Sequence, residues 1–272
     1  MPATPTRRAA APRDQAHGLR QLFAGRPSRF VPLVHNPHVS DTGVVMERLC
    51  AAFGVLRLRT LVVDAADTAS PPHELATVDL AACIEPLSDQ VSYLAARGLA
   101  MHYLDGRATL TGFLDALASA APQADVVLLH AGALDLRRMF IGRTPCPVLL
   151  AGAGPDSLTH AYTSMKLLSQ RLGALAYDLV VAGDVSLRRA RRMADRLDDC
   201  ADHFLGAALR DLALVDTQVP PHAPLPDDLR ALAAGLVAPS LPVAPVNGLA
   251  ELPVPTAPRT QARRSAVAGR TN

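Results

Sequence analysis

The polar side chains best suited to chemistry follow predicted strands. One predicted strand is followed directly by the loop at 35–43 (HNPHVSDTG), and two others end at Asp64 and His130. In an open parallel α/β sheet, ligands bind outside the carboxyl ends of the strands, so we expect these groups at one edge. Imidazoles together with a carboxylate are typical zinc ligands. A metal-dependent enzyme is therefore one hypothesis, with these candidate ligands: His35, His38, Asp64 and His130.

The loop at 35–43 also lies where a nucleotide-binding α/β protein carries its phosphate loop. Such a loop lines up backbone N–H groups through glycine conformations and adds a lysine for the phosphates. Here only Gly43 is a glycine, Pro37 removes a donor and Asp41 adds a negative charge. Lys166 is the chain's single lysine among 27 basic residues, and it lies in another predicted helix. The loop has the position of a phosphate loop without its chemistry.

The elements that must position these loops alternate between strands and helices. Apolar runs predict strands at 29–34, 58–64, 99–104, 125–130, 146–151, 177–182 and 209–215. Helical periodicity predicts helices at 42–53, 109–120, 157–172, 186–199 and 227–236. This alternation predicts an α/β fold, a mostly parallel sheet with helices on both faces. We expect a basic arm at 1–28 with a short helix at 14–24, an α/β domain at 29–239 and a disordered tail at 240–272.

Composition excludes several classes of function. Hydrophobic residues make up 49% of the 272 residues, which supplies a core, whereas aromatic residues make up 4% and tryptophan is absent. An aromatic platform for nucleic-acid bases is therefore not expected. No apolar run is long enough to span a membrane. The four cysteines form no C-x-x-C pair, which favours buried free thiols in a reducing cytosol. We expect a cytoplasmic protein.

Several sequence elements resemble one family. The DQAHGLR element at 14–20, the loop at 35–43, LVVDAAD and GPDSLTHAYTSMKLL are similar to MinD/ParA-type regulators of flagellar number, the FlhG/FleN family. The likeness runs over 14–239. In the FlhG/FleN family, the loop that corresponds to 35–43 reads GKGGVGKTT. Aligned on the following helix, Asn36 replaces the deviant lysine, Asp41 replaces the phosphate lysine, and Thr42 remains as a potential magnesium ligand.

The resemblance extends to other positions of the nucleotide site. Asp64 matches the aspartate that positions or activates the attacking water. His130 stands where the family has a metal-contacting aspartate, and Ala182 where it has an adenine-contacting asparagine. Phosphoryl transfer relies on positioning and on cationic stabilisation. The resemblance therefore implies a pseudo-ATPase that binds neither ATP nor magnesium. A working ATPase with an atypical loop is the alternative.

The resemblance also implies a partner. In the family, the DQAxGLR element engages a signal-recognition-type GTPase that places flagella, and stimulates its GTP hydrolysis. An amide such as that of Gln15 can both donate to and accept from an attacking water. The matching contact residues would be Asp14, Gln15, Ala16, Leu19, Arg20 and Phe23. A purely structural helix packed on the body is the alternative.

Other interactions stay open at this point. Flagellar switch proteins, a transcriptional activator and a homodimer are further candidate partners. The arginines at 188–192 would suit an acidic partner or DNA, but Asp195, Asp198 and Asp199 follow at spacings that favour a self-compensated face. Nucleic-acid binding is therefore not a strong prediction. The helix at 227–236 is amphipathic but carries Asp227 and Asp228, so we expect contact with the inner membrane or cell pole only through a partner.

Overall fold

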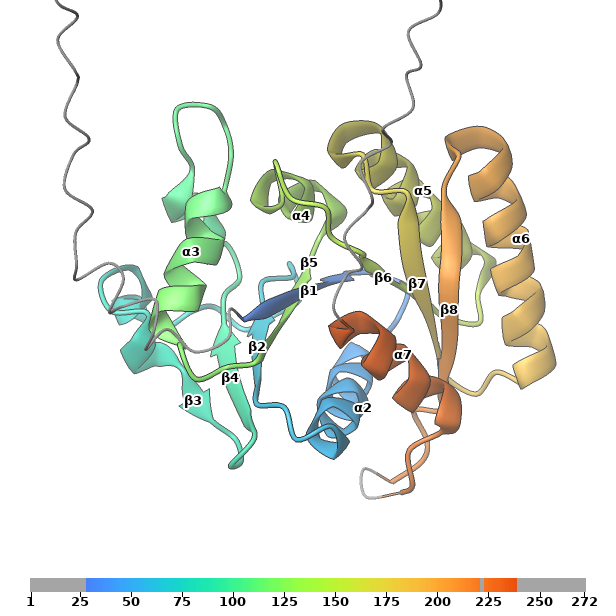
Figure 1. Ribbon diagram of the computed structural model, residues 1–272, viewed down its shortest axis with the longest axis horizontal. Coiled ribbons are helices and arrows are strands. Elements are labelled where there is room, and N and C mark those ends of the chain that lie inside the picture. The colour runs from blue at the N-terminus through green and yellow to red at the C-terminus, as the bar shows by residue number, and fades with distance from the viewer. Residues whose placement is uncertain (1–27, 221–222, 239–272) are drawn as a thin grey trace, which may run out of the picture. The chain divides into compact units, whose positions relative to one another are not determined.

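A computed structural model describes residues 28–220 and 223–238 (Figure 1). Within this part of the chain, eight strands form one sheet in the order β3-β4-β2-β5-β1-β6-β7-β8. All neighbouring strands are parallel except β3, which is antiparallel to β4. The strands are β1 (Arg29–Val34), β2 (Thr60–Asp64), β3 (Glu85–Pro86), β4 (Val91–Ala95), β5 (Val126–Ala131), β6 (Val148–Ala151), β7 (Ala176–Ala182) and β8 (Ala208–Val215).

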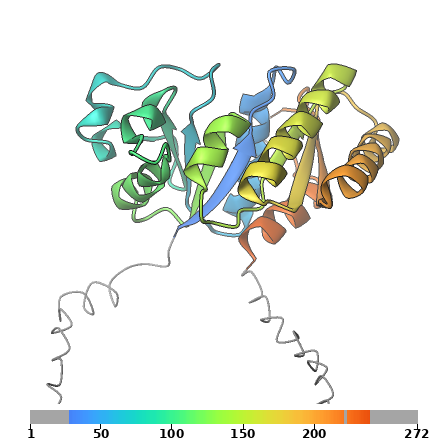
Figure 2. The ribbon, with the colours of Figure 1, turned by 90° about the horizontal axis from the view of Figure 1, so that it is seen from above.

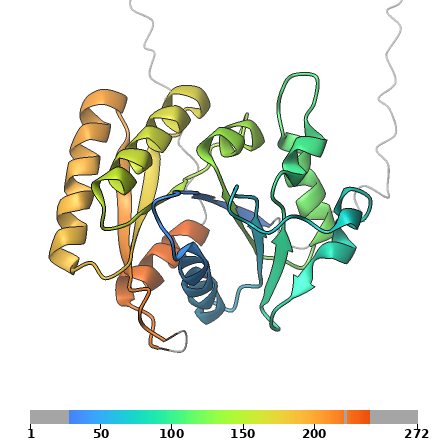
Figure 3. The ribbon, with the colours of Figure 1, turned by 180° about the vertical axis from the view of Figure 1, so that it is seen from behind.

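Helices cover both faces of the sheet, as the alternation predicted. Helices α2 (Thr42–Val55) and α7 (Asp227–Val237) pack on one face (Figure 3). The other face carries α3 (Thr111–Ala120), α4 (Ala133–Met139), α5 (Pro155–Leu172) and α6 (Leu187–Leu205). Figure 2 shows α4, α5 and α6 side by side. Short 3-10 helices are η1 (Glu74–Thr77), η2 (Ala81–Cys83) and η3 (Leu99–Tyr103).

The strands separate two apolar layers because successive side chains point to opposite faces of a sheet. In β5, Val127 and Leu129 join the layer under α3, α4, α5 and α6, whereas Val126 and Leu128 join the layer under α2 and α7. Every residue of β5 is buried. Its near-continuous apolar sequence is typical of a parallel strand covered on both faces, which explains why the sequence identified it.

Most predicted elements are confirmed with boundaries shifted by a few residues, but the strand predicted at 99–104 is wrong. That segment is the 3-10 helix η3, and the strand of this region is β4. Gly98 has φ of +74° and turns the chain immediately before Leu99. Leu99 and Ala100 are buried because they pack into the core as a short helix, so their apolar character does not mark a strand.

Helix α6 ends six residues later than predicted, at Leu205, and is capped by Gly206 at φ of +61°. The helix predicted at 227–236 is α7, whose Leu229, Leu232 and Leu236 pack into the core beside α2. No helix among the described residues is long and apolar enough to cross a membrane. The cysteines are free, but Cys200 is exposed, contrary to the expectation of buried thiols.

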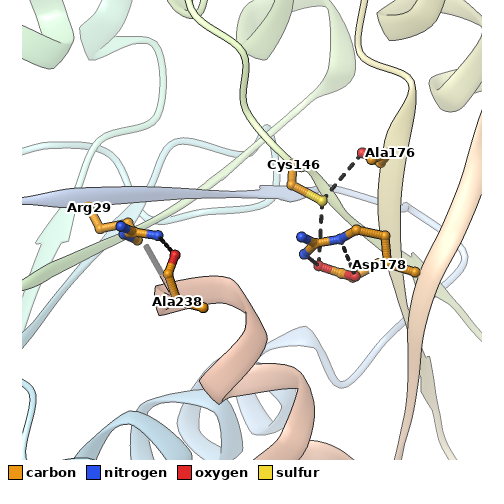
Figure 4. A network of polar contacts seen from close by, with 6 residues as sticks. Arg29, Cys146, Ala176, Asp178 and Ala238 are labelled. Carbon is orange, nitrogen blue, oxygen red and sulfur yellow. Dashed lines mark hydrogen bonds and ion pairs between the residues drawn. The ribbon is translucent and has the colours of Figure 1, made fainter. Parts of the chain in front are cut away.

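An ion pair between a buried aspartate and an exposed arginine joins β7 and β8 near their amino ends. The side chain of Asp178 is fully buried, and Nη2 of Arg210 lies 2.5 Å from its Oδ2. The hydrogen bonds from Arg210 to this carboxylate raise the pKa of the guanidinium. Cys146 lies beside the same carboxylate (Figure 4), and burial followed by the charge of Asp178 raises the pKa of its thiol to about 12. In the same view, Arg29 donates to the carbonyl of Ala238.

Candidate functional site

The candidate site is the crevice between the loops that follow β1 and β6. These strands are neighbours, yet β1 leads to α2 on one face of the sheet and β6 leads to α5 on the other. Connections that part in this way mark a topological switch point, where open α/β sheets bind ligands. The loop at 35–43, which the sequence places at this edge, lies here opposite residues 152–154, which follow β6.

Asn36 fills the crevice with its own side chain. Only 1% of Asn36 is exposed. Its Nδ2 donates to the carbonyl oxygens of Leu150 and Ser157, at 2.7 and 2.9 Å. These acceptors belong to β6 and to the first turn of α5, so the amide joins both sides of the switch point. An amide can form these bonds while uncharged, whereas an ammonium group here would be buried without a counter-charge.

Two backbone donors of the loop, the N–H groups of His38 and Val39, are also engaged. The N–H of His38 donates to Oδ1 of Asn36 at 3.1 Å, and the N–H of Val39 donates to the Asn36 carbonyl at 3.0 Å. Pro37 has no N–H. A phosphate loop works because successive N–H groups point at the ligand. At 37–39, none of the three residues offers a donor to an anion.

A second network links three strands on the far side of β1. Asp64 and His130 occupy paired positions on β2 and β5, with Oδ1 of Asp64 2.7 Å from Nδ1 of His130. The other ring nitrogen of His130, Nε2, lies 3.1 Å from Nδ1 of His35, just after β1. The network is buried, since His130 is 2% exposed and His35 9%. The result is a chain of polar groups in the order carboxylate, imidazole, imidazole.

The direction of the hydrogen bonds in this network follows from the carboxylate of Asp64. An ionised Asp64 can only accept, so Nδ1 of His130 carries the hydrogen. A neutral His130 then accepts at Nε2 from the N–H of His35. Burial is the largest effect on His35 and lowers its pKa below 6.5, and His130 lowers it further, against Asp67 and Asp64, which raise it. The lowered pKa favours the neutral form of His35, in which Nδ1 must carry the hydrogen in order to donate to His130.

A carboxylate borders the remaining space. Asp41 lines it and is exposed just before α2. A small cavity of about 170 Å³ lies between the loop at 38–41, Gly152, Ala182 and Thr217. Pockets for nucleotide-sized ligands measure roughly 300–1,000 Å³. The cavity is therefore smaller than the usual pocket for a ligand of that size.

The predicted site residues divide into separate groups. Asp64, His130 and His35 lie together, whereas His38 turns toward His160 on α5, with ring centroids 6.0 Å apart. The hydroxyl of Thr42 donates to the Val39 carbonyl at 3.1 Å. Among residues 28–220 and 223–238, no cluster of three metal-ligating side chains is found, so the metal hypothesis gains no support. The predicted docking residues lie outside the described residues: Asp14, Gln15, Ala16, Leu19, Arg20 and Phe23.

Sequence reasoning missed two residues of the crevice, Ser157 and His160. Ser157 is fully buried, and its Oγ accepts from the N–H of Gly152 at 2.7 Å. His160 forms a hydrogen bond with the backbone of His35, and burial lowers its pKa. Both stand in the first two turns of the helix that follows β6. They therefore lie at the carboxyl end of a strand, where open α/β sheets bind ligands, and this signal could have found them.

Comparisons with known proteins identify the fold. The Aquifex aeolicus MinD cell division protein superimposes with a TM-score of 0.54 at 10% identity, covering 80% of this chain and 100% of MinD. McdA from Cyanothece, in a complex with ATP, gives 0.54 at 11%, covering 81% and 100%. A Borrelia burgdorferi plasmid partition protein gives 0.52 at 9%, covering 78% and 97%. No family model and no curated protein matches the sequence.

Proposed function

We propose that this chain, on its MinD/ParA-like fold, is a regulator that acts without binding or hydrolysing ATP. The observation that carries the proposal is the Asn36 side chain, which occupies the switch-point crevice and bonds to β6 and α5. Two further observations support it. The N–H groups of His38 and Val39 are already bonded within the loop, and the carboxylate of Asp41 is exposed there. Lys166, the only lysine of the chain, is an exposed residue in the middle of α5.

A nucleotide-binding test addresses this proposal directly. A ligand that binds the native state raises the free energy of unfolding, so the melting temperature of a binding protein rises with ligand concentration. We expect no rise for the full chain when ATP and magnesium are added at several millimolar. The Aquifex MinD protein serves as a reference in the same assay. A rise of several degrees for this chain would overturn the proposal and return the ATPase alternative.

The biological process we propose is control of flagellar assembly or number. The support is the resemblance of DQAHGLR at 14–20 and of the helix sequence SLTHAYTSMKLL to FlhG/FleN-type regulators. The chain would dock on a flagellar signal-recognition-type GTPase through 14–24 and stimulate it. Flagellar switch proteins or a transcriptional activator would be further partners, and a partner would bring the chain to the inner membrane or cell pole.

A GTPase assay with two variants and a peptide tests the docking step. Gln15→Ala should lose most of the stimulation while binding is retained, because Ala16, Leu19 and Phe23 supply the apolar contact. Leu19→Asp should abolish binding itself, since it places a charge in that contact. A peptide of residues 1–26 should stimulate the GTPase without the body. Stimulation that survives Gln15→Ala, or that needs residues 31–239, would contradict this role for the segment.

A further inference from the structure

A groove of about 730 Å³ runs between α5 and α6 and begins at Ala153 in the loop after β6, which also borders the switch-point crevice. Its apolar lining comes from both helices, with Leu158 and Tyr162 on α5 and Met193 and Leu197 on α6. Met193 and Leu197 are buried beneath it, and Leu158 and Tyr162 are half-buried. The groove therefore combines a fixed apolar floor with two helical walls.

Three arginines of α6 line the same groove: Arg189, Arg192 and Arg196. All three are exposed, and none of the described lining residues is acidic. At about 100° per residue, they fall on one stripe of α6 that extends along roughly 10 Å of the helix. Nη2 of Arg189 donates to the Ala153 carbonyl at 2.7 Å, which anchors this side chain at one end of the groove.

The aspartates of α6 do not neutralise this stripe, contrary to the expectation of a self-compensated face. Among the described residues, no ion pair forms between the arginines at 188–196 and Asp195, Asp198 or Asp199. Asp198 instead accepts from the backbone N–H of Leu209 at 2.7 Å, so it faces β8. The helix thus keeps a positive stripe beside an apolar floor.

We propose that this groove binds an acidic amphipathic helix of a partner protein. Such a helix would place apolar residues at i, i+3, i+4 and i+7 on Leu158, Tyr162 and Leu197, in the helix-in-groove manner. Carboxylates along one side of its apolar stripe would face Arg192 and Arg196. Arginine suits this task because its planar guanidinium bonds a carboxylate through two parallel N–H groups.

Charge distinguishes this occupant from the chain's own segments. Residues 1–30 carry a net charge of +5 and residues 240–272 a net charge of +3, so both ends are repelled by the arginine stripe. A symmetric pairing of two copies through this face would bring the stripe against itself. An acidic segment of a partner protein pairs its carboxylates with the arginine stripe without such repulsion. This surface is separate from the docking segment at 14–24 and does not depend on it.

The test uses the full chain and two designed 15-residue helical peptides with the same leucine stripe, one flanked by glutamates and the other by lysines. Fluorescence anisotropy of the labelled peptides measures binding. We expect the acidic peptide to bind and the basic peptide not to bind. The double variant Arg192→Glu/Arg196→Glu should weaken acidic-peptide binding by at least about tenfold, equivalent to roughly 1.4 kcal/mol.

The matched control is Arg188→Glu/Arg191→Glu, which makes the same charge change on the same helix outside the groove. It should bind the acidic peptide within about twofold of the wild type. Exposed Cys200 lines the groove, so bound peptide should also slow its alkylation, as located by mass spectrometry. Circular dichroism melts confirm that each variant is folded.

Three outcomes would overturn the proposal. The first is no binding of the acidic peptide, or equal weakening by both double variants. The second is peptide binding that leaves Cys200 alkylation unchanged. The third is self-association of the full chain that Arg192→Glu/Arg196→Glu abolishes, which would assign the groove to a second copy.

Discussion

Asp64 and His130 lie at paired positions on the parallel strands β2 and β5, and Oδ1 of the carboxylate is 2.7 Å from Nδ1 of the imidazole. The resemblance implies a water-positioning role for an aspartate at position 64. Here its carboxylate is bonded to a buried imidazole from the next strand, which is itself bonded to His35. The polar groups at this edge of the sheet are thereby bonded to one another. On the other side of β1, the Asn36 amide bonds to β6 and α5.

Asn36→Ala should destabilise the domain by about 2–3 kcal/mol. The substitution leaves the buried Leu150 and Ser157 carbonyls without this donor, and an unsatisfied buried group costs about 1–3 kcal/mol. Urea denaturation measures the change. Ser40→Ala, an exposed position of the same loop, is the control and should stay within about 0.5 kcal/mol of the wild type. Equal effects of the two substitutions would show that the Asn36 amide does not hold the crevice closed.

The stability of the domain should fall as the pH drops from 7.5 to 5.5. The folded state lowers the pKa of His35 below its ordinary 6.5, so the unfolded chain binds more protons once the pH is below 6.5. The free energy of unfolding therefore decreases with falling pH and levels off below the folded-state pKa. His160, whose pKa is also lowered, adds a change in the same direction.

His35→Gln should reduce this pH dependence, since its amide can still donate to His130 but does not titrate in this range. Thermal melts of both proteins across the pH series provide the measurement, with their difference at pH 8 as the baseline. If the two stability profiles run parallel from pH 7.5 to 5.5, His35 does not contribute to the pH dependence.

Asn36→Lys/Asp41→Lys should not produce ATP hydrolysis. Pro37 still lacks an N–H, and His130 still stands in place of a carboxylate for a metal ion. A lysine at position 36 would also place a charge in a buried position, which should lower the melting temperature. Phosphate release with ATP and magnesium measures the outcome. Robust turnover would show that two lysines suffice and that the loop accommodates a triphosphate.

Arg210→Met should destabilise the domain by about 3 kcal/mol. It leaves the fully buried Asp178 without its charged partner, and an uncompensated buried carboxylate has costs of this order, although the Arg210 side chain itself is 39% exposed. The control is Arg143→Met, which removes an exposed partner of Asp115 and should cost about 0–1 kcal/mol. Chemical denaturation of both variants gives the comparison. Similar small losses would mean that water reaches Asp178 after the substitution.

The strand–helix alternation and the edge at which the polar loops meet were readable from the sequence alone. Strands such as β5 were predictable because an apolar run of this length is needed wherever both faces of a sheet are covered. The chemistry of the loop at 35–43 was also readable, since Pro37 and Asp41 exclude the usual donors and charge without reference to the fold. Apolar periodicity is a local property, so a few adjacent residues suffice to reveal it.

Which distant residues touch depends on the strand order and register of the folded sheet. Asn36 and Ser157 are 121 positions apart, and they meet because the strand order places β6 beside β1. Asp64 meets His130 because the register of β2 against β5 pairs them, and a shift by one residue would point one of them to the other face. The apolar residues at 99–104 predict a strand, but the segment forms the 3-10 helix η3. Leu99 and Ala100 are buried in the core as part of this short helix, and their apolar character alone does not show which element buries them.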